Sequence, residues 1–156
     1  MRIYEEHLDG HDLSVAVAVS RFNSVITERL LAGAMEGLGE LGVPEDRTVV
    51  AWVPGSFELP FAARRFAESG RYDAVICLGC VIKGETDHDI YINQQMARGI
   101  AEVSTETGVP AIFGVLTTNN LEQALARADE GTTNKGYEAA YAAVTMAHLR
   151  RRLAET

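Results

Sequence analysis

The segment Lys83–His88 carries residue types that could bind an anion and transfer a proton. Gly84 allows the backbone to come close to a ligand, and the Thr86 hydroxyl can donate a hydrogen bond. If this segment opens a helix, its free N–H groups and the helix dipole favour an anion such as phosphate, and the side chain of Glu85 must then point away. The alternative is that Thr86 or Asp87 only caps the helix, because capping signatures are common.

His88 is the candidate for proton transfer, because a neutral imidazole can both accept and donate a proton near physiological pH. The other three histidines are less favourably placed: His7 and His11 lie in a polar N-terminal segment, and His148 lies in the last predicted helix. The alternative for His88 is a position on a helix surface with no special role.

Three further groups of side chains belong to the same hypothesis. Phe22 and Phe113 could enclose a flat ligand, although aromatic residues at strand ends are more often part of a core. The Glu58 carboxylate could bind a ligand, but it is also an ordinary partner of a helix N-terminus. A bound phosphate would need a cation, for which Arg127 is a candidate. The alternative for Arg127 is a solvated helix end.

These residues must be positioned by an alternation of β-branched runs and longer helical patterns. The strands are predicted at Leu13–Ser20, Arg47–Val53, Tyr72–Ile82 and Pro110–Leu116. The helices are predicted at about Ser24–Leu41, Phe57–Gly70, Asp87–Thr107, Leu121–Ala128 and Lys135–Leu153. This order predicts a three-layer, flavodoxin-like α/β fold with a four-stranded parallel sheet and helices on both faces. Asn23 or Ser24 can cap the first helix, and Gly42 stands where a C-terminal glycine belongs.

The carboxyl ends of parallel strands share one edge of a sheet, where ligands bind in open α/β folds. The loops that follow the four strands should therefore meet there, and they contain aromatic, carboxylate, imidazole, glycine and hydroxyl groups.

The length and net charge of the chain limit the number of domains and the kinds of partner that we expect. The chain has 156 residues, enough for one domain over residues 13–156, while residues 1–12 are either a frayed tail or an extra strand lent to a neighbour. Lys and Arg total 14 and Asp and Glu total 22, a net charge of −8. Nucleic acid and anionic membranes are not the expected partners, because they require a basic surface. No membrane span or signal peptide is recognisable, so the expected location is the cytoplasm.

Several motifs lack the context that their chemistry needs. Gly37–Gly42 matches a dinucleotide-binding pattern, but it ends a helix instead of following a strand. Cys77 and Cys80 lie three positions apart on a strand, so they point to opposite faces about 10 Å apart, too far for a disulfide or a shared metal. No phosphate-binding P-loop and no metal-ligand spacing occurs, and neither a metal nor a cofactor is expected.

A series of short motifs, in order along most of the chain, resembles the 6,7-dimethyl-8-ribityllumazine synthase family of riboflavin biosynthesis. The motifs are Arg21–Asn23, Val53–Pro60, Leu78–Thr86 with His88, Pro110–Thr118, Glu122–Ala124 and Asn134–Gly136. The resemblance implies condensation of 5-amino-6-(D-ribitylamino)uracil with 3,4-dihydroxy-2-butanone 4-phosphate, without a cofactor or metal.

The resemblance also implies roles for individual residues. His88 would be the acid and base, and the phosphate would be bound by Gly84, Glu85, Thr86 and Arg127. The ribitylaminouracil would be bound by Phe22, Asn23, Ser56, Phe57, Glu58, Cys80, Val81, Ile82, Phe113 and Lys135.

The family's assembly implies partners as well. Its members form pentamers with active sites between subunits, many build shells of twelve pentamers, and riboflavin synthase is a candidate partner. The insertion associated with stopping at the pentamer is absent here, which favours a shell, and residues 1–12 would then pair with a neighbouring sheet.

The sequence departs from the family pattern at Asp89, where an aromatic residue is usual, and at Asp129 and Glu130, where the usual loop begins Ala-Gly. These departures leave open a carrier that binds flavin or lumazine without chemistry. A separate alternative is a monomeric flavodoxin-like regulatory domain.

Overall fold

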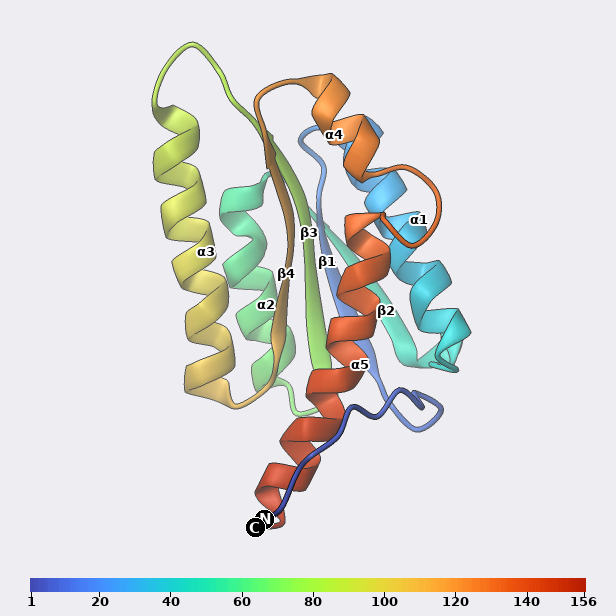
Figure 1. The fold of residues 1–156 in the computed structure, drawn as a ribbon. Coiled ribbons are helices and arrows are strands. Elements are labelled where there is room, and N and C mark those ends of the chain that lie inside the picture. The colour runs from blue at the N-terminus through green and yellow to red at the C-terminus, as the bar shows by residue number, and fades with distance from the viewer.

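A computed structural model describes residues 1–156, whose four strands form one parallel sheet. The strands are β1 (Val15–Ser20), β2 (Thr48–Val53), β3 (Ala74–Ile82) and β4 (Ala111–Thr118). Their order across the sheet is β2-β1-β3-β4 (Figure 1). The predicted sheet type is therefore confirmed, and the central position of β1 and β3 accounts for their almost continuous apolar sequence.

Helices cover both faces of this sheet, which confirms the three-layer prediction. They are α1 (Ser24–Glu40), α2 (Leu59–Glu68), α3 (His88–Thr107), α4 (Leu121–Arg127) and α5 (Lys135–Ala154). Figure 1 shows α2 and α3 on one face and α1 and α5 on the other. Side chains of β1 alternate accordingly: Val15, Val17 and Val19 belong to the core under α1 and α5, and Ala16 and Ala18 to the core under α2 and α3.

The local structure differs from the predictions at the start of two helices. The helix expected from about Phe57 begins with a separate 3-10 turn, Ser56–Glu58, before α2. Asn23 occupies the N-cap position of α1, but its side chain makes no capping hydrogen bond. The end of α1 is as expected, because Gly42 follows it with a φ of 86°.

The contact between α1 and α5 is close because Gly136 lies in the first turn of α5. A Cβ atom at this position would lie 1.9 Å from the carbonyl oxygen of Leu30. Asn134, which is buried, caps α5 by accepting hydrogen bonds from the amides of Gly136 and Tyr137. The same side chain donates to the carbonyl oxygen of Arg29 in α1, so Asn134 fixes the two helices together.

Residues 1–12 contain no helix or strand and run along the chain's own α5 (Figure 1). Arg151 of α5 donates hydrogen bonds to Asp12 at 2.8 Å and to Asp73 at 3.1 Å. The His148 ring lies 2.6 Å from the carbonyl oxygen of Asp9. These contacts tie the segment to the domain; its pairing with a neighbouring sheet stays a prediction.

Candidate functional site

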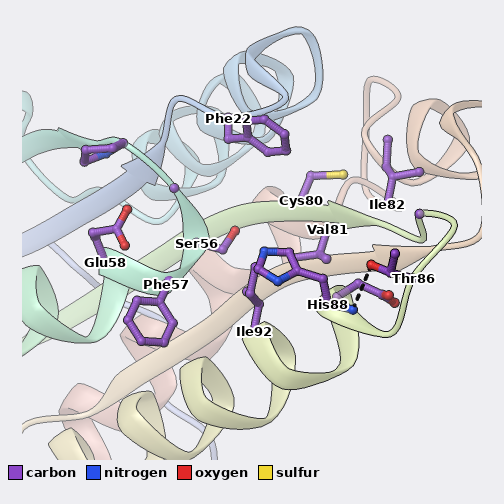
Figure 2. Close-up of a pocket in the computed structure, with 14 residues that line it drawn as sticks. Phe22, Ser56, Phe57, Glu58, Cys80, Val81, Ile82, Thr86, His88 and Ile92 are labelled. Carbon is purple, nitrogen blue, oxygen red and sulfur yellow. Dashed lines mark hydrogen bonds between the residues drawn. The ribbon is translucent and has the colours of Figure 1, made fainter.

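A cavity of about 530 Å³ opens at the carboxyl ends of β1, β2 and β3, the edge of the sheet at which the sequence predicts a site. Figure 2 shows the side chains that surround it. Its lining comes from the loop after β1, the turn after β2, the end of β3 and the start of α3. The predicted site residues in this lining are Phe22, Ser56, Phe57, Glu58, Cys80, Val81, Ile82, Gly84, Thr86 and His88.

The loop between β3 and α3 leaves backbone donors free. The amide groups of residues 84–87 make no hydrogen bond within the chain. Thr86 caps the first turn of α3 in part, because its Oγ1 accepts a hydrogen bond from the His88 amide at 3.3 Å. Asp87 stands at the N-cap position, yet its side chain caps nothing. The capping alternative thus holds for one amide, while four donors stay available to an anion.

His88 is the first residue of α3, and its exposed side chain borders the cavity (Figure 2). The Ser56 side chain and the end of β3 face the same hollow. The His88 imidazole and the free amides of Gly84 and Thr86 therefore lie at one cavity, in which an acid and base could act on an anionic substrate.

The turn after β2 is held against β3. The amides of Arg21 and Phe22 donate to the carbonyl oxygens of Val53 and Pro54, at 2.8 and 3.1 Å, so hydrogen bonds connect the loops after β1 and β2. Ser56 is buried against Gly79 of β3, where an added Cβ atom would lie 2.6 Å from the Ser56 Oγ. The glycine therefore allows this turn to approach the sheet.

Asn23 stands behind the cavity wall instead of in it. Its φ is 62°, in the left-handed region that asparagine tolerates better than most residues. The side-chain amide donates to the Cys80 carbonyl oxygen at 2.8 Å. Asn23 thus connects the loop after β1 to the end of β3 and leaves Phe22 exposed at the mouth of the cavity.

The two cysteines are both free and buried. They point to opposite faces of β3, as predicted, since Cys77 packs in the core under α2 and α3 and Cys80 in the core under α1 and α5. Burial raises the pKa of Cys77 to about 12 and the pKa of Cys80 to about 11. Neither thiol is therefore an activated nucleophile.

Besides Asn23, four predicted site residues do not line the cavity of the single chain: Phe113, Arg127, Lys135 and Glu85. Phe113 lies in the edge strand β4, level with Cys77 and away from the strand ends. Arg127 is the last residue of α4, and Lys135 is the first of α5. Glu85 is exposed within the loop before α3.

Four lining residues were not among the predicted ones: Pro54, Gly55, Asp89 and Ile92. Ile92 follows His88 by four positions in α3, so helical periodicity alone could have identified it. Asp89 adds a carboxylate to the cavity. Its Oδ1 atom is shielded from solvent and has no hydrogen-bond partner.

Comparison with known families adds one finding. A family model described as 6,7-dimethyl-8-ribityllumazine synthase matches residues 12–151 of the chain. The structure contains no helix with both the length and the apolar character needed to cross a bilayer. It also gathers no group of three His, Cys, Asp or Glu side chains that could hold a metal ion.

Proposed function

Because the chain belongs to the 6,7-dimethyl-8-ribityllumazine synthase family, whose model spans residues 12–151, we propose that it makes this lumazine. The substrates are 5-amino-6-(D-ribitylamino)uracil and 3,4-dihydroxy-2-butanone 4-phosphate, and phosphate and water are released. The observation that carries the proposal is the shared cavity, whose lining combines His88, the free amides of Gly84 and Thr86, and exposed aromatic side chains.

The ribitylaminouracil occupies the part of the cavity bordered by Phe22 and the Ser56–Glu58 turn. Phe22 is 70% exposed and offers its ring face to the flat pyrimidine. The main chain at Cys80–Ile82 and the Glu58 carboxylate supply polar partners for the ring and the ribityl chain. Asn23 positions this wall through its hydrogen bond to Cys80.

The phosphate of the second substrate binds to the loop before α3. Free amides of Gly84, Glu85 and Thr86 point their donors at the anion, and the N-terminal end of the 20-residue helix α3 adds a favourable dipole. The ketone carbon of the bound substrate then lies between this loop and the pyrimidine, close to His88.

The reaction uses an amine of the substrate as its nucleophile. The 5-amino nitrogen attacks the ketone carbon, the carbinolamine loses water to form a Schiff base, phosphate leaves, and closure of the ring releases water. His88 donates and accepts the protons of these steps, and the cavity contributes by holding the two reactants together. No side chain of the protein needs to form a covalent bond to substrate.

A neighbouring copy of the chain completes the site in this proposal. Phe113, Arg127 and Lys135 lie outside the cavity of their own chain, and an adjoining subunit can bring them to it. Large apolar side chains are exposed on the two helices of one face of the sheet: Phe61 of α2 and Tyr91 of α3 are 73% and 68% exposed. A pentamer would cover such a surface, and twelve pentamers could close into a shell.

The test is a product assay with both substrates, followed by the absorbance of the lumazine. Wild-type protein should form product well above the uncatalysed rate. His88→Ala should lower kcat by about 10²–10⁴-fold, the usual contribution of a general acid and base. His11→Ala is the matched control, because His11 is exposed and bonds only to Asp9.

Equal turnover by the His88 variant and wild type would remove the role of His88. A protein that copurifies with a yellow, fluorescent ligand and makes no lumazine would instead be a carrier of the same fold.

A further inference from the structure

Asp89 differs from every other residue that lines the cavity. Its Oδ1 atom is closed off from solvent and has no hydrogen-bond donor within reach. An unpaired polar atom of this kind is unfavourable, because it has lost its water and gained no partner. Such groups are rare in folded proteins and often mark a functional constraint.

The position of Asp89 relates it to the phosphate loop. It is the second residue of α3, directly after His88, and the four free amides of residues 84–87 precede it by one turn. A negative charge is thus built into the first turn of the helix whose N-terminal end would hold an anion. The charge interacts favourably with the helix dipole and so stabilises the helix, but it repels a phosphate bound to the same turn.

We propose that the Asp89 carboxylate limits the affinity of the cavity for phosphate and so speeds the departure of inorganic phosphate after its elimination. This inference rests on the proposed function, because it requires phosphate to bind at the loop before α3. Product release limits the turnover of many enzymes, and a built-in repulsion is a simple means of weakening the hold on an anionic product.

The partial burial of Asp89 separates its effect from that of nearby exposed acids. Asp87 stands two positions earlier and is exposed, so water and salt screen its charge. Asp89 has one oxygen away from water, and its field is screened less. The two residues therefore form a matched pair of equal charge and different burial.

The experiment measures the Kd of inorganic phosphate by calorimetry for wild type, Asp89→Asn and Asp87→Asn. Asp89→Asn should bind phosphate more tightly, on the order of three- to tenfold, and Asp87→Asn should change the Kd by less. Product inhibition should follow the same order, with phosphate inhibiting Asp89→Asn most strongly. Asp89→Glu keeps the charge and should stay within about twofold of wild type.

Four results would overturn the proposal. Unchanged or weaker phosphate binding by Asp89→Asn would leave Asp89 with only a structural role at the helix end, as would equal effects of the Asp87 and Asp89 variants. Tighter binding by Asp89→Glu would show that the charge is not responsible. A changed sedimentation coefficient for Asp89→Asn would place the carboxylate in a subunit interface.

The product assay tests the reaction independently of the phosphate titrations. If wild type makes no lumazine but the phosphate titrations give the expected order, the proposed reaction fails while the role of Asp89 in anion binding stands. If wild type does not bind phosphate at all, the role of Asp89 fails, whatever the product assay shows.

Discussion

Replacing Gly79 with alanine should displace the Ser56 side chain from the wall of the cavity. A Cβ atom at position 79 would lie 2.6 Å from the Ser56 Oγ and 3.1 Å from the Leu59 Cδ1. The first distance is about 0.8 Å shorter than the 3.4 Å at which ordinary van der Waals contact begins. Because Gly79 lies in the buried strand β3, the Ser56–Glu58 turn is the part that must move.

The displacement should lower both the stability of the fold and the rate of the reaction. Overpacking a core costs about 1–3 kcal/mol of unfolding free energy. A shift of about 1 Å in groups that position a substrate can lower a rate by on the order of 10²-fold. Gly79→Ala should therefore lower the unfolding free energy by about 1–3 kcal/mol and lower kcat/KM by roughly 10- to 100-fold.

Urea unfolding and the lumazine assay measure these effects, and a second substitution identifies their cause. Ser56→Ala removes the Oγ atom, after which the nearest atom of residue 56 is its Cβ at 3.5 Å. The double variant should be more stable than Gly79→Ala alone by about 1 kcal/mol. Gly39→Ala is the control, because no atom lies within 4 Å of its added Cβ. A Gly79→Ala variant that unfolds like wild type, or a double variant that recovers no stability, would refute the predicted clash.

Four further predictions follow from the structure. In urea unfolding, Asn23→Ala should be less stable than Asn23→Gly by about 1 kcal/mol. Both variants lose the hydrogen bond to the Cys80 carbonyl oxygen, but only alanine is strained at a φ of 62°. Equal losses of stability would contradict this. Burial raises the pKa of Cys80 to about 11, so iodoacetamide should alkylate the folded protein slowly at pH 8 and faster toward pH 11, unlike an exposed thiol. The pKa of Cys77 is also raised by burial, to about 12 from 9.0. The unfolded chain therefore releases these protons first, and stability should fall as the pH rises above 9.0, less steeply in Cys77→Ala. Gly136→Ala should lower the unfolding free energy by about 3 kcal/mol or more, because its Cβ would lie 1.9 Å from a backbone oxygen of Leu30; a wild-type urea midpoint would show that the helices separate easily.

The sequence was most informative where local pattern and burial agree. The runs at Leu13–Ser20 and Tyr72–Ile82 are apolar on both faces because β1 and β3 lie in the middle of a parallel sheet. The pattern therefore predicted these strands to within two residues at their N-terminal ends. Helix ends were predictable where a single residue decides them, as at Gly42.

Non-local contacts explain what the sequence did not reveal. Asn23 is a good N-cap residue by type, yet its side chain binds the Cys80 carbonyl oxygen, 57 positions away. The 3-10 turn at Ser56–Glu58 depends on its approach to Gly79, which lies in another strand. Neither contact leaves a signal in the local sequence.

In the candidate site, too, some residues could be predicted from the sequence and others could not. Loops after β1, β2 and β3 could be assigned to one cavity because the carboxyl ends of adjacent parallel strands meet. Phe113 and Arg127 were candidates by residue type and position, and Lys135 was assigned through the family resemblance; the folded chain keeps all three outside that cavity. Asp89 was noted only as a departure, and its unpaired oxygen became apparent from the packing around α3.

The most direct test of a catalytic site shared between two copies is lumazine formation by mixed assemblies. His88→Ala and Arg127→Ala chains are each expected to be nearly inactive as pure assemblies. Coexpressed in equal amounts, they should recover activity at about one quarter of the sites, where intact His88 of one copy meets intact Arg127 of the next. Mixed assemblies no more active than either pure variant would contradict the account.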